Sequence, residues 1–284
     1  MPFERGSISL PKYLMHCNVM HYFTPALTEF EADMARVEHL LNLLKSFRSF
    51  GASDVNGAGE NGNSGWPEAL ALHTLSKHLR TDLPVLAGSL VLYIAGRFEY
   101  FVRQLVEAAI DEIVSRYAKF DDLPKDIKGI ARSKILEVAQ ASGRYGFSEL
   151  ETNLFIGQLA KNLTGDLSPP TIPSRVFSIT DANMKDRVLA DLMKRVGMES
   201  FWKELGKQAP LKLFLDKLLD ADTTAEAISR LNKIMDDRNQ IAHPTAATEF
   251  PDPDQVLMST DFLNVLAKVI VDVLSVHMNS MKPS

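Results

Sequence analysis

Apolar residues recur at intervals of three and four along most of this chain, and that spacing predicts helices that each bury one face. The clearest apolar stripes lie over about 24–50, 84–120 and 260–278. Strand signals are scarce, because no stretch sustains an alternation of apolar and polar residues and no Asn-Gly or Asp-Gly turn joins two such runs. The pattern predicts an all-α protein with a four-helix bundle core and additional N-terminal and inserted helices.

Turn and capping residues predict where several helices begin. Thr24 and Pro25 fit an N-cap followed by proline at the first helical position, and Thr223 with Glu226 has the spacing of a capping box. A segment rich in glycine and asparagine, 51–65, predicts a mobile loop. The remaining helices are expected as two within 121–166, then at about 180–196, 199–219 and 223–243.

These elements suggest two parts. Residues 1–83 would form an N-terminal helix and the Gly/Asn-rich loop, packed on the core, and residues 84–284 would form the main helical domain. The 284 residues are enough for one large helical domain or two small ones. No apolar run is judged long enough to span a bilayer, and the N-terminus lacks the pattern of a signal peptide.

The composition favours a cytoplasmic protein. Cys17 is the single cysteine, which excludes an internal disulfide framework and fits a reducing compartment. The net charge of −5 argues against a protein that coats nucleic acid through a broad basic face. It leaves room for an enzyme with a small positive cleft, whose affinity for an anionic substrate is modest or is supplemented by a partner.

The candidate chemistry lies at the end of the helix expected over 223–243. Arg238, Asn239 and His243 fall within six residues, and Asn239 and His243 are four apart and so share a face. Arginine offers phosphate a planar, permanently charged fork, and histidine can move a proton near neutral pH. In the alternative interpretation, His243-Pro244 merely ends a helix and Arg238 forms a surface salt bridge with a neighbouring aspartate.

The string from Arg238 to His243 resembles the Arg-x4–6-His motif of HEPN superfamily ribonucleases, which also often have asparagine after the arginine. Two further stretches are similar to the RiboL-PSP-HEPN branch. The run Leu90–Ile113 is similar to its first core helix, and Asn183–Gly197 to its asparagine followed by a Leu-rich helix. The likeness extends over roughly residues 85–278.

The resemblance implies a HEPN-like bundle and a metal-independent endoribonuclease in which Arg238, Asn239 and His243 are catalytic. It makes Glu99 a candidate to orient Arg238 or His243; a surface pair between Glu99 and Arg103 is an equal alternative. It implies an RNA substrate, a homodimer with a composite active site, and no cofactor.

The resemblance also fits a toxin or effector of a prokaryotic defence system, controlled by a sensor or antitoxin protein. The rival hypothesis is a non-catalytic HEPN-like subunit that binds RNA or supports assembly. A metal site is not expected, because the spacings of His16, Cys17 and His21, and of His73 and His78, do not suit zinc.

Overall fold

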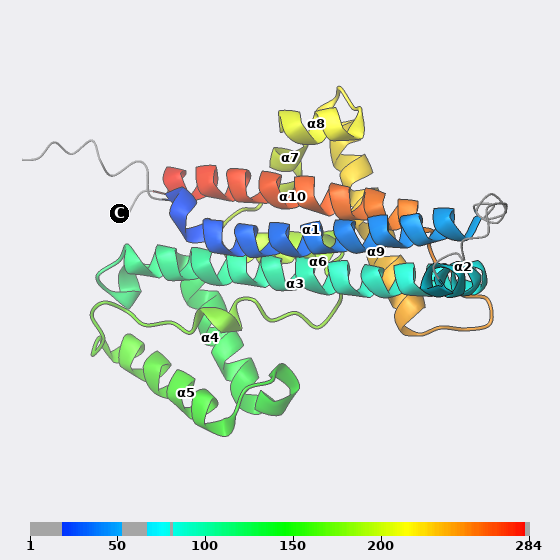
Figure 1. Ribbon diagram of the computed structural model, residues 1–284. Helices are drawn as coiled ribbons and strands as arrows, with labels where there is room; N and C mark the ends of the chain where they lie inside the picture. The colour runs from blue at the N-terminus through cyan, green and yellow to red at the C-terminus, as the bar shows by residue number, and fades with distance from the viewer. Residues whose placement is uncertain (1–18, 53–66, 80–81, 282–284) are drawn as a thin grey trace, which may run out of the picture.

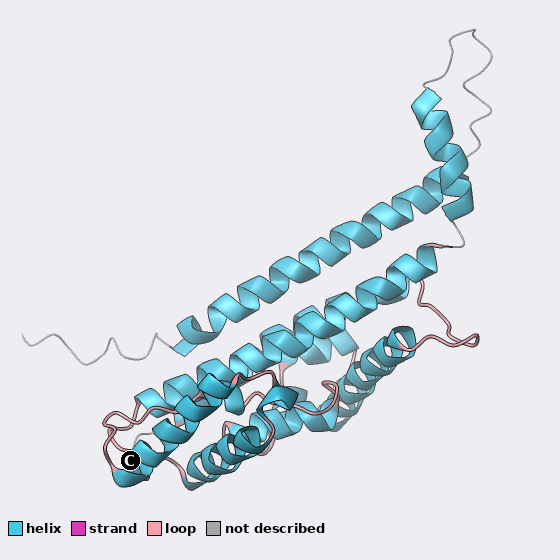
Figure 2. Ribbon diagram, turned by 90° about the horizontal axis from the view of Figure 1, so that it is seen from below, coloured by secondary structure: helices cyan, strands magenta, loops and turns pink. Residues whose placement is uncertain are grey.

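A computed structural model describes residues 19–52, 67–79 and 82–281 of the chain. Throughout those ranges the regular structure is helical, and no strand occurs in them, which confirms the all-α prediction (Figures 1 and 2). Short 3-10 turns cover Phe120–Asp122, Ser142–Tyr145 and Ser174–Val176. The α-helices are α1 (Val19–Ala52), α2 (Pro67–Leu79), α3 (Leu83–Ser115), α4 (Lys125–Gln140), α5 (Glu149–Thr164), α6 (Asp186–Arg195), α7 (Phe201–Gly206), α8 (Ala209–Leu215), α9 (Asp220–Ala242) and α10 (Pro253–Ser280).

Three long helices, α1, α3 and α10, run side by side, and α9 packs against α3 and α10 (Figure 1). Their facing stripes form one continuous hydrophobic core, in which phenylalanines from α1 and α3 stack on each other. The α4–α5 pair extends from one side of this bundle, and α7 and α8 cover α9 and α10. The separation of the chain at residue 83 into two parts stays a prediction.

Helix α3 lies at the centre of the bundle. By length and apolar composition alone it is sufficient to cross a membrane, contrary to the expectation that no apolar run is long enough. Its buried residues, from Leu83 to Val114, pack against α1, α9 and α10, and a buried core helix meets the same criterion of composition. Leu86 precedes Leu90 and Ile94 by four and eight residues, which predicts a place on their apolar stripe, but Leu86 is 47% exposed near the start of the helix.

Two helix starts were predicted wrongly. Helix α1 begins at Val19 and includes Pro25, because the added turn buries Phe23 in the core. Helix α9 begins at Asp220, and Thr223 is fully buried within it, where its hydroxyl donates to the Leu219 carbonyl. A threonine in a helix can make this backward bond instead of capping, so the capping-box spacing was misleading.

Other helix boundaries differ from the predicted ones because of local capping and proline residues. Helix α10 begins at Pro253, seven residues before the expected start, because Asp252 and Gln255 form a capping box there. The helix expected over 199–219 is divided into α7 and α8, with Pro210 in the first turn of α8, where its missing N–H is tolerated. Of the helix expected over 180–196, only Asp186–Arg195 is helical.

Candidate active site at the end of helix α9

The last turn of α9 carries the Arg-Asn-His motif. Arg238 and Asn239 lie within the helix, and His243 is its C-cap residue, whose backbone N–H donates to the Asn239 carbonyl at 3.1 Å. The His243 side chain is exposed. Ala242 follows Met235 by seven residues, which predicts a place on the buried stripe of this helix, yet Ala242 is exposed as well. An imidazole at an open helix end is accessible to a polymeric substrate.

Close packing against α3 positions this end of α9. Ile241 is buried, and both Ile241 and Phe250 lie against Gly88 of α3. A β-carbon at Gly88 would lie 2.6 Å from Cδ1 of Phe250, so the absence of a side chain at Gly88 permits the contact. The loop that follows His243 therefore packs against the bundle through Phe250.

Arg238 is half-buried and forms no ion pair within the described part of the chain. Its Nη1 donates to Oδ1 of Asn239 at 3.2 Å. The neighbouring aspartates are bound to lysines instead: Asp236 to Lys185 at 2.5 Å and Asp237 to Lys233 at 3.1 Å. The salt bridge that would have given Arg238 a purely structural role is therefore not formed, and its guanidinium retains free donors.

Asn239 connects the motif to another part of the chain. Its Oδ1 accepts hydrogen bonds from Arg238 and from Nδ2 of Asn183, the latter at 2.5 Å. Asn183 lies in the non-helical stretch before α6, whose first residue, Asp186, exchanges two hydrogen bonds with Asn232 of α9. Asn183 was not selected as a site residue, although it begins one of the stretches that resemble the RiboL-PSP-HEPN pattern.

Glu99 on α3 supports the same stretch. Its Oε1 accepts a hydrogen bond from the backbone N–H of Met184 at 3.2 Å. Within the described residues no hydrogen bond or ion pair joins Glu99 to Arg238, His243 or Arg103. Glu99 thus holds the backbone beside Asn183, and its connection to the motif runs through that residue.

The described residues contain no group of three or more histidine, cysteine or acidic side chains placed to hold a metal ion. His73 is buried on α2, edge-on to Phe50 at 5.3 Å between ring centroids. His16 and Cys17 lie outside the described residues, as do the side chains of His21 and His78.

The helical bundle and the motif at the end of α9 define a HEPN-type protein. The family described as RiboL-PSP-HEPN matches residues 70–276, and the chain belongs to that family. The match includes α3, the Asn183 stretch and the whole motif. Searches among curated proteins and among solved structures found no match. HEPN domains are often ribonucleases, so membership points to a nuclease or another RNA-related function.

Proposed function

We propose that this protein is a metal-independent endoribonuclease that uses Arg238 and His243. The observation that supports the proposal most strongly is the state of Arg238, a half-buried cation with no carboxylate partner in the described part of the chain. Burying a charge without a partner is costly, and both nearby aspartates are bound to lysines. A phosphate group would supply the missing negative charge.

The proposed reaction is an internal transfer at the RNA phosphate. The ribose 2′-oxygen attacks the adjacent phosphorus as it loses its proton to a base, and the bond from phosphorus to the 5′-oxygen breaks as that oxygen gains a proton. The products are a 2′,3′-cyclic phosphate and a 5′-hydroxyl. His243 would provide one of the two proton transfers, and Arg238 would stabilise the charge on the non-bridging oxygens. Asn239, held by Asn183, would fix the direction of the Arg238 guanidinium.

One motif supplies one histidine, whereas the reaction needs both a proton acceptor and a proton donor. Two motifs meeting across a twofold axis would supply both, which is why we propose a homodimer with a composite cleft. Sedimentation of the purified full chain at micromolar concentration should give twice the mass of one chain. A monomer that cleaves RNA would contradict the composite cleft and leave the roles of Arg238 and His243 to be tested separately.

We further propose that the enzyme is a toxin or effector of a prokaryotic defence system that a partner protein activates. The net charge of −5 supports weak RNA binding by the isolated chain, because affinity for nucleic acid depends on cationic contacts to phosphate. A chain of this kind would harm its host little until a sensor or antitoxin protein changed its state.

The reaction class is tested with end-labelled RNA in excess EDTA. Cleavage should persist in the chelator, and the products should carry cyclic phosphate and 5′-hydroxyl ends. Loss of cleavage in EDTA, restored by magnesium or manganese, would contradict the mechanism. RNA binding without cleavage would support the rival, a non-catalytic RNA-binding or assembly subunit.

A further inference from the structure

A polar hollow on another side of α3 is lined by both arginines and aromatic rings. It has a volume of about 390 Å³, within the range of pockets that bind small molecules. Its walls come from α3, from the 3-10 turn before α5, and from the stretch that leads towards Asn183. The lining residues that matter for its chemistry are Tyr100, Arg103, Glu107, Tyr145, Phe147 and Arg175.

Arg103 is the unusual group in this hollow. It is half-buried, its Nη2 donates to the Thr180 hydroxyl at 2.9 Å, and its Nε is buried without a hydrogen-bond partner. No ion pair involves it within the described residues, whereas the other arginine, Arg175, is paired with Glu151 at 2.8 Å. An unpaired, partly desolvated guanidinium with free donors is a suitable site for a phosphate group.

Two tyrosines line the same hollow as Arg103, and each already has another arginine over its ring: Arg97 lies 4.8 Å from the Tyr100 ring centroid and Arg144 lies 5.5 Å from that of Tyr145. Tyr100 directly follows Glu99 on α3, and the residue is 45% exposed at the rim of the hollow. Tyr145 is half-buried at the opposite wall, where its hydroxyl donates to Glu137 at 2.5 Å. An exposed and a half-buried tyrosine in one hollow with an unpaired guanidinium match the two parts of a nucleotide, a base that stacks and a phosphate that accepts hydrogen bonds.

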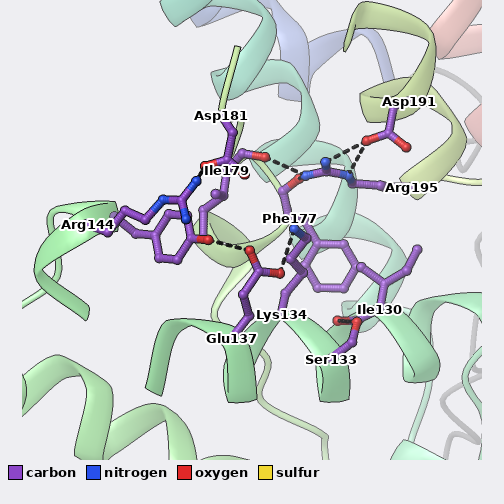
Figure 3. Close-up of polar contacts among 11 residues, drawn as sticks. Ile130, Ser133, Lys134, Glu137, Arg144, Phe177, Ile179, Asp181, Asp191 and Arg195 are labelled. Carbon is purple, nitrogen blue, oxygen red and sulfur yellow. Dashed lines mark hydrogen bonds and ion pairs between the residues drawn. The ribbon is translucent and has the colours of Figure 1, made fainter. Parts of the chain in front are cut away.

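The wall of the hollow is fixed before any ligand arrives. Figure 3 shows Arg195 of α6 donating to the carbonyls of Phe177 and Ile179, at 2.8 and 2.7 Å, while it also binds Asp191. From the other side, the Ser178 hydroxyl donates to Glu107 at 2.5 Å. A site held in place in this way loses little conformational freedom on binding.

The same stretch of chain connects the hollow to the motif. Thr180 contacts Arg103 in the hollow, and Asn183, three residues later, contacts Asn239 of the motif. Three residues span at most roughly 10 Å. On α3, Glu99 and Arg103 are separated by four residues, or roughly 6 Å of helix. The hollow and the motif are therefore joined by one short segment of chain, and a strand of a few nucleotides would be long enough to reach both.

We infer that the hollow lined by Tyr100, Arg103 and Tyr145 binds a nucleotide, with its phosphate on Arg103 and its base against the tyrosine rings. Glu107 would accept a hydrogen bond from a base amine or a ribose hydroxyl. The nucleotide is either one unit of an RNA strand that continues to the motif or a free nucleotide. That the ligand is part of an RNA strand rests on the proposed function. That the hollow binds a nucleotide does not, because binding requires no cleavage.

The inference is tested by fluorescence anisotropy with the full-length chain and a labelled single-stranded RNA carrying 2′-O-methyl groups, which cannot be cleaved by 2′-OH attack. Tyr100→Ala should weaken binding by about fivefold to a hundredfold, the loss associated with one base–aromatic stack. Arg103→Gln should lower the slope of log affinity against log salt by about 0.7, as expected for one lost phosphate contact on a single strand. Tyr22→Ala, with the same 45% exposure on α1, and Arg132→Ala, an exposed arginine on α4, are the matched controls.

A second arm uses adenosine monophosphate and adenosine as probes. If the monophosphate binds and Arg103→Gln weakens it while leaving adenosine unchanged, the hollow takes free nucleotides; if only RNA binding depends on Tyr100 and Arg103, the ligand is part of a strand. Both outcomes support the site. RNA and monophosphate affinities that are unaffected in both variants, at unchanged melting temperature, would overturn it. Such a result would not affect the proposal that the protein is a nuclease. Conversely, if the protein cleaved no RNA, binding to the hollow could still be measured by this experiment.

Discussion

Three hydrogen bonds hold the side chains of the motif and the chain beside it in position. Asn183 and Arg238 both donate to Asn239 Oδ1, and Glu99 accepts from the backbone next to Asn183. The lysines beside the motif occupy its aspartates, which keeps Arg238 available to an anion. The chemistry on phosphate that we propose would therefore depend on polar contacts that come from three separate segments of the chain.

Substitutions at Arg238 should show whether cleavage needs only its positive charge or also the paired donors of its guanidinium. Arg238→Ala should lower the rate of RNA cleavage by about a hundredfold to a thousandfold, the loss typical for one group that stabilises developing charge. Arg238→Lys should recover little, because the ammonium cannot offer two parallel donors to phosphate. The measurement is single-turnover cleavage beside thermal melting. Arg230→Ala, two turns earlier on α9 and bound to Glu226, is the matched control and should retain activity. Near-normal cleavage by Arg238→Lys would show that a point charge suffices.

Glu137 and Tyr145 give a prediction about pH. The Tyr145 hydroxyl first, and the Lys134 ammonium second, hold the pKa of Glu137 below its usual value. A depressed pKa stabilises the fold at pH values above the unfolded pKa, about 4.3 for glutamate, and the contribution is lost as pH falls through the lower, folded pKa. Tyr145→Phe should therefore melt below the parent at pH 7, and the difference should shrink below about pH 4.3. A difference that stays constant from pH 7 to pH 3 would contradict this role.

At the scale of elements, the apolar stripes predicted the helices well and their ends poorly. The stripe of α10 is buried as expected, from Leu263 to Leu274, because it depends only on spacing. Its true start could have been found from Asp252, Pro253 and Gln255, which form a readable capping pattern. The contact between Asn183 and Asn239 could not have been found from the sequence. These residues are 56 positions apart and meet only because α9 packs against α3 and α6.

Two glycines test how closely the elements pack. In Gly206→Ala, the new β-carbon would lie 2.5 Å from the Asp220 carbonyl oxygen, so the end of α7 must move from the start of α9. We expect a loss of about 1–3 kcal/mol in the free energy of unfolding. Gly129→Ala, in the exposed interior of α4 with no neighbouring atom within 4 Å, should instead gain about 0.5–1 kcal/mol. Chemical denaturation measures both, and equal effects of the same sign would contradict the packing described.

At the scale of the whole molecule, a single stretch of chain connects the hollow on α3 with the Arg-Asn-His motif at the end of α9. The stretch from Arg175 to Asp186 forms a wall of the hollow lined by Tyr100, Arg103 and Tyr145, and then reaches Asn239 and Asn232 at the motif helix. The sequence alone selects Arg238 and His243 as candidates, because both belong to one short motif. It did not reveal the hollow, whose residues come from α3, the turn before α5 and the stretch before α6, and meet only in the folded chain.

We propose above all that the full chain cleaves RNA through His243 without a metal. The most direct measurement compares the parent and His243→Ala on labelled RNA in excess EDTA, with melting temperatures recorded on the same preparations. His39→Ala, another exposed histidine on α1, is the control. We predict that His243→Ala melts like the parent, because the side chain is exposed, and loses about a hundredfold to ten-thousandfold in cleavage rate, while His39→Ala retains full activity. Full activity in a well-folded His243→Ala protein would contradict the assignment of the nuclease site to this motif.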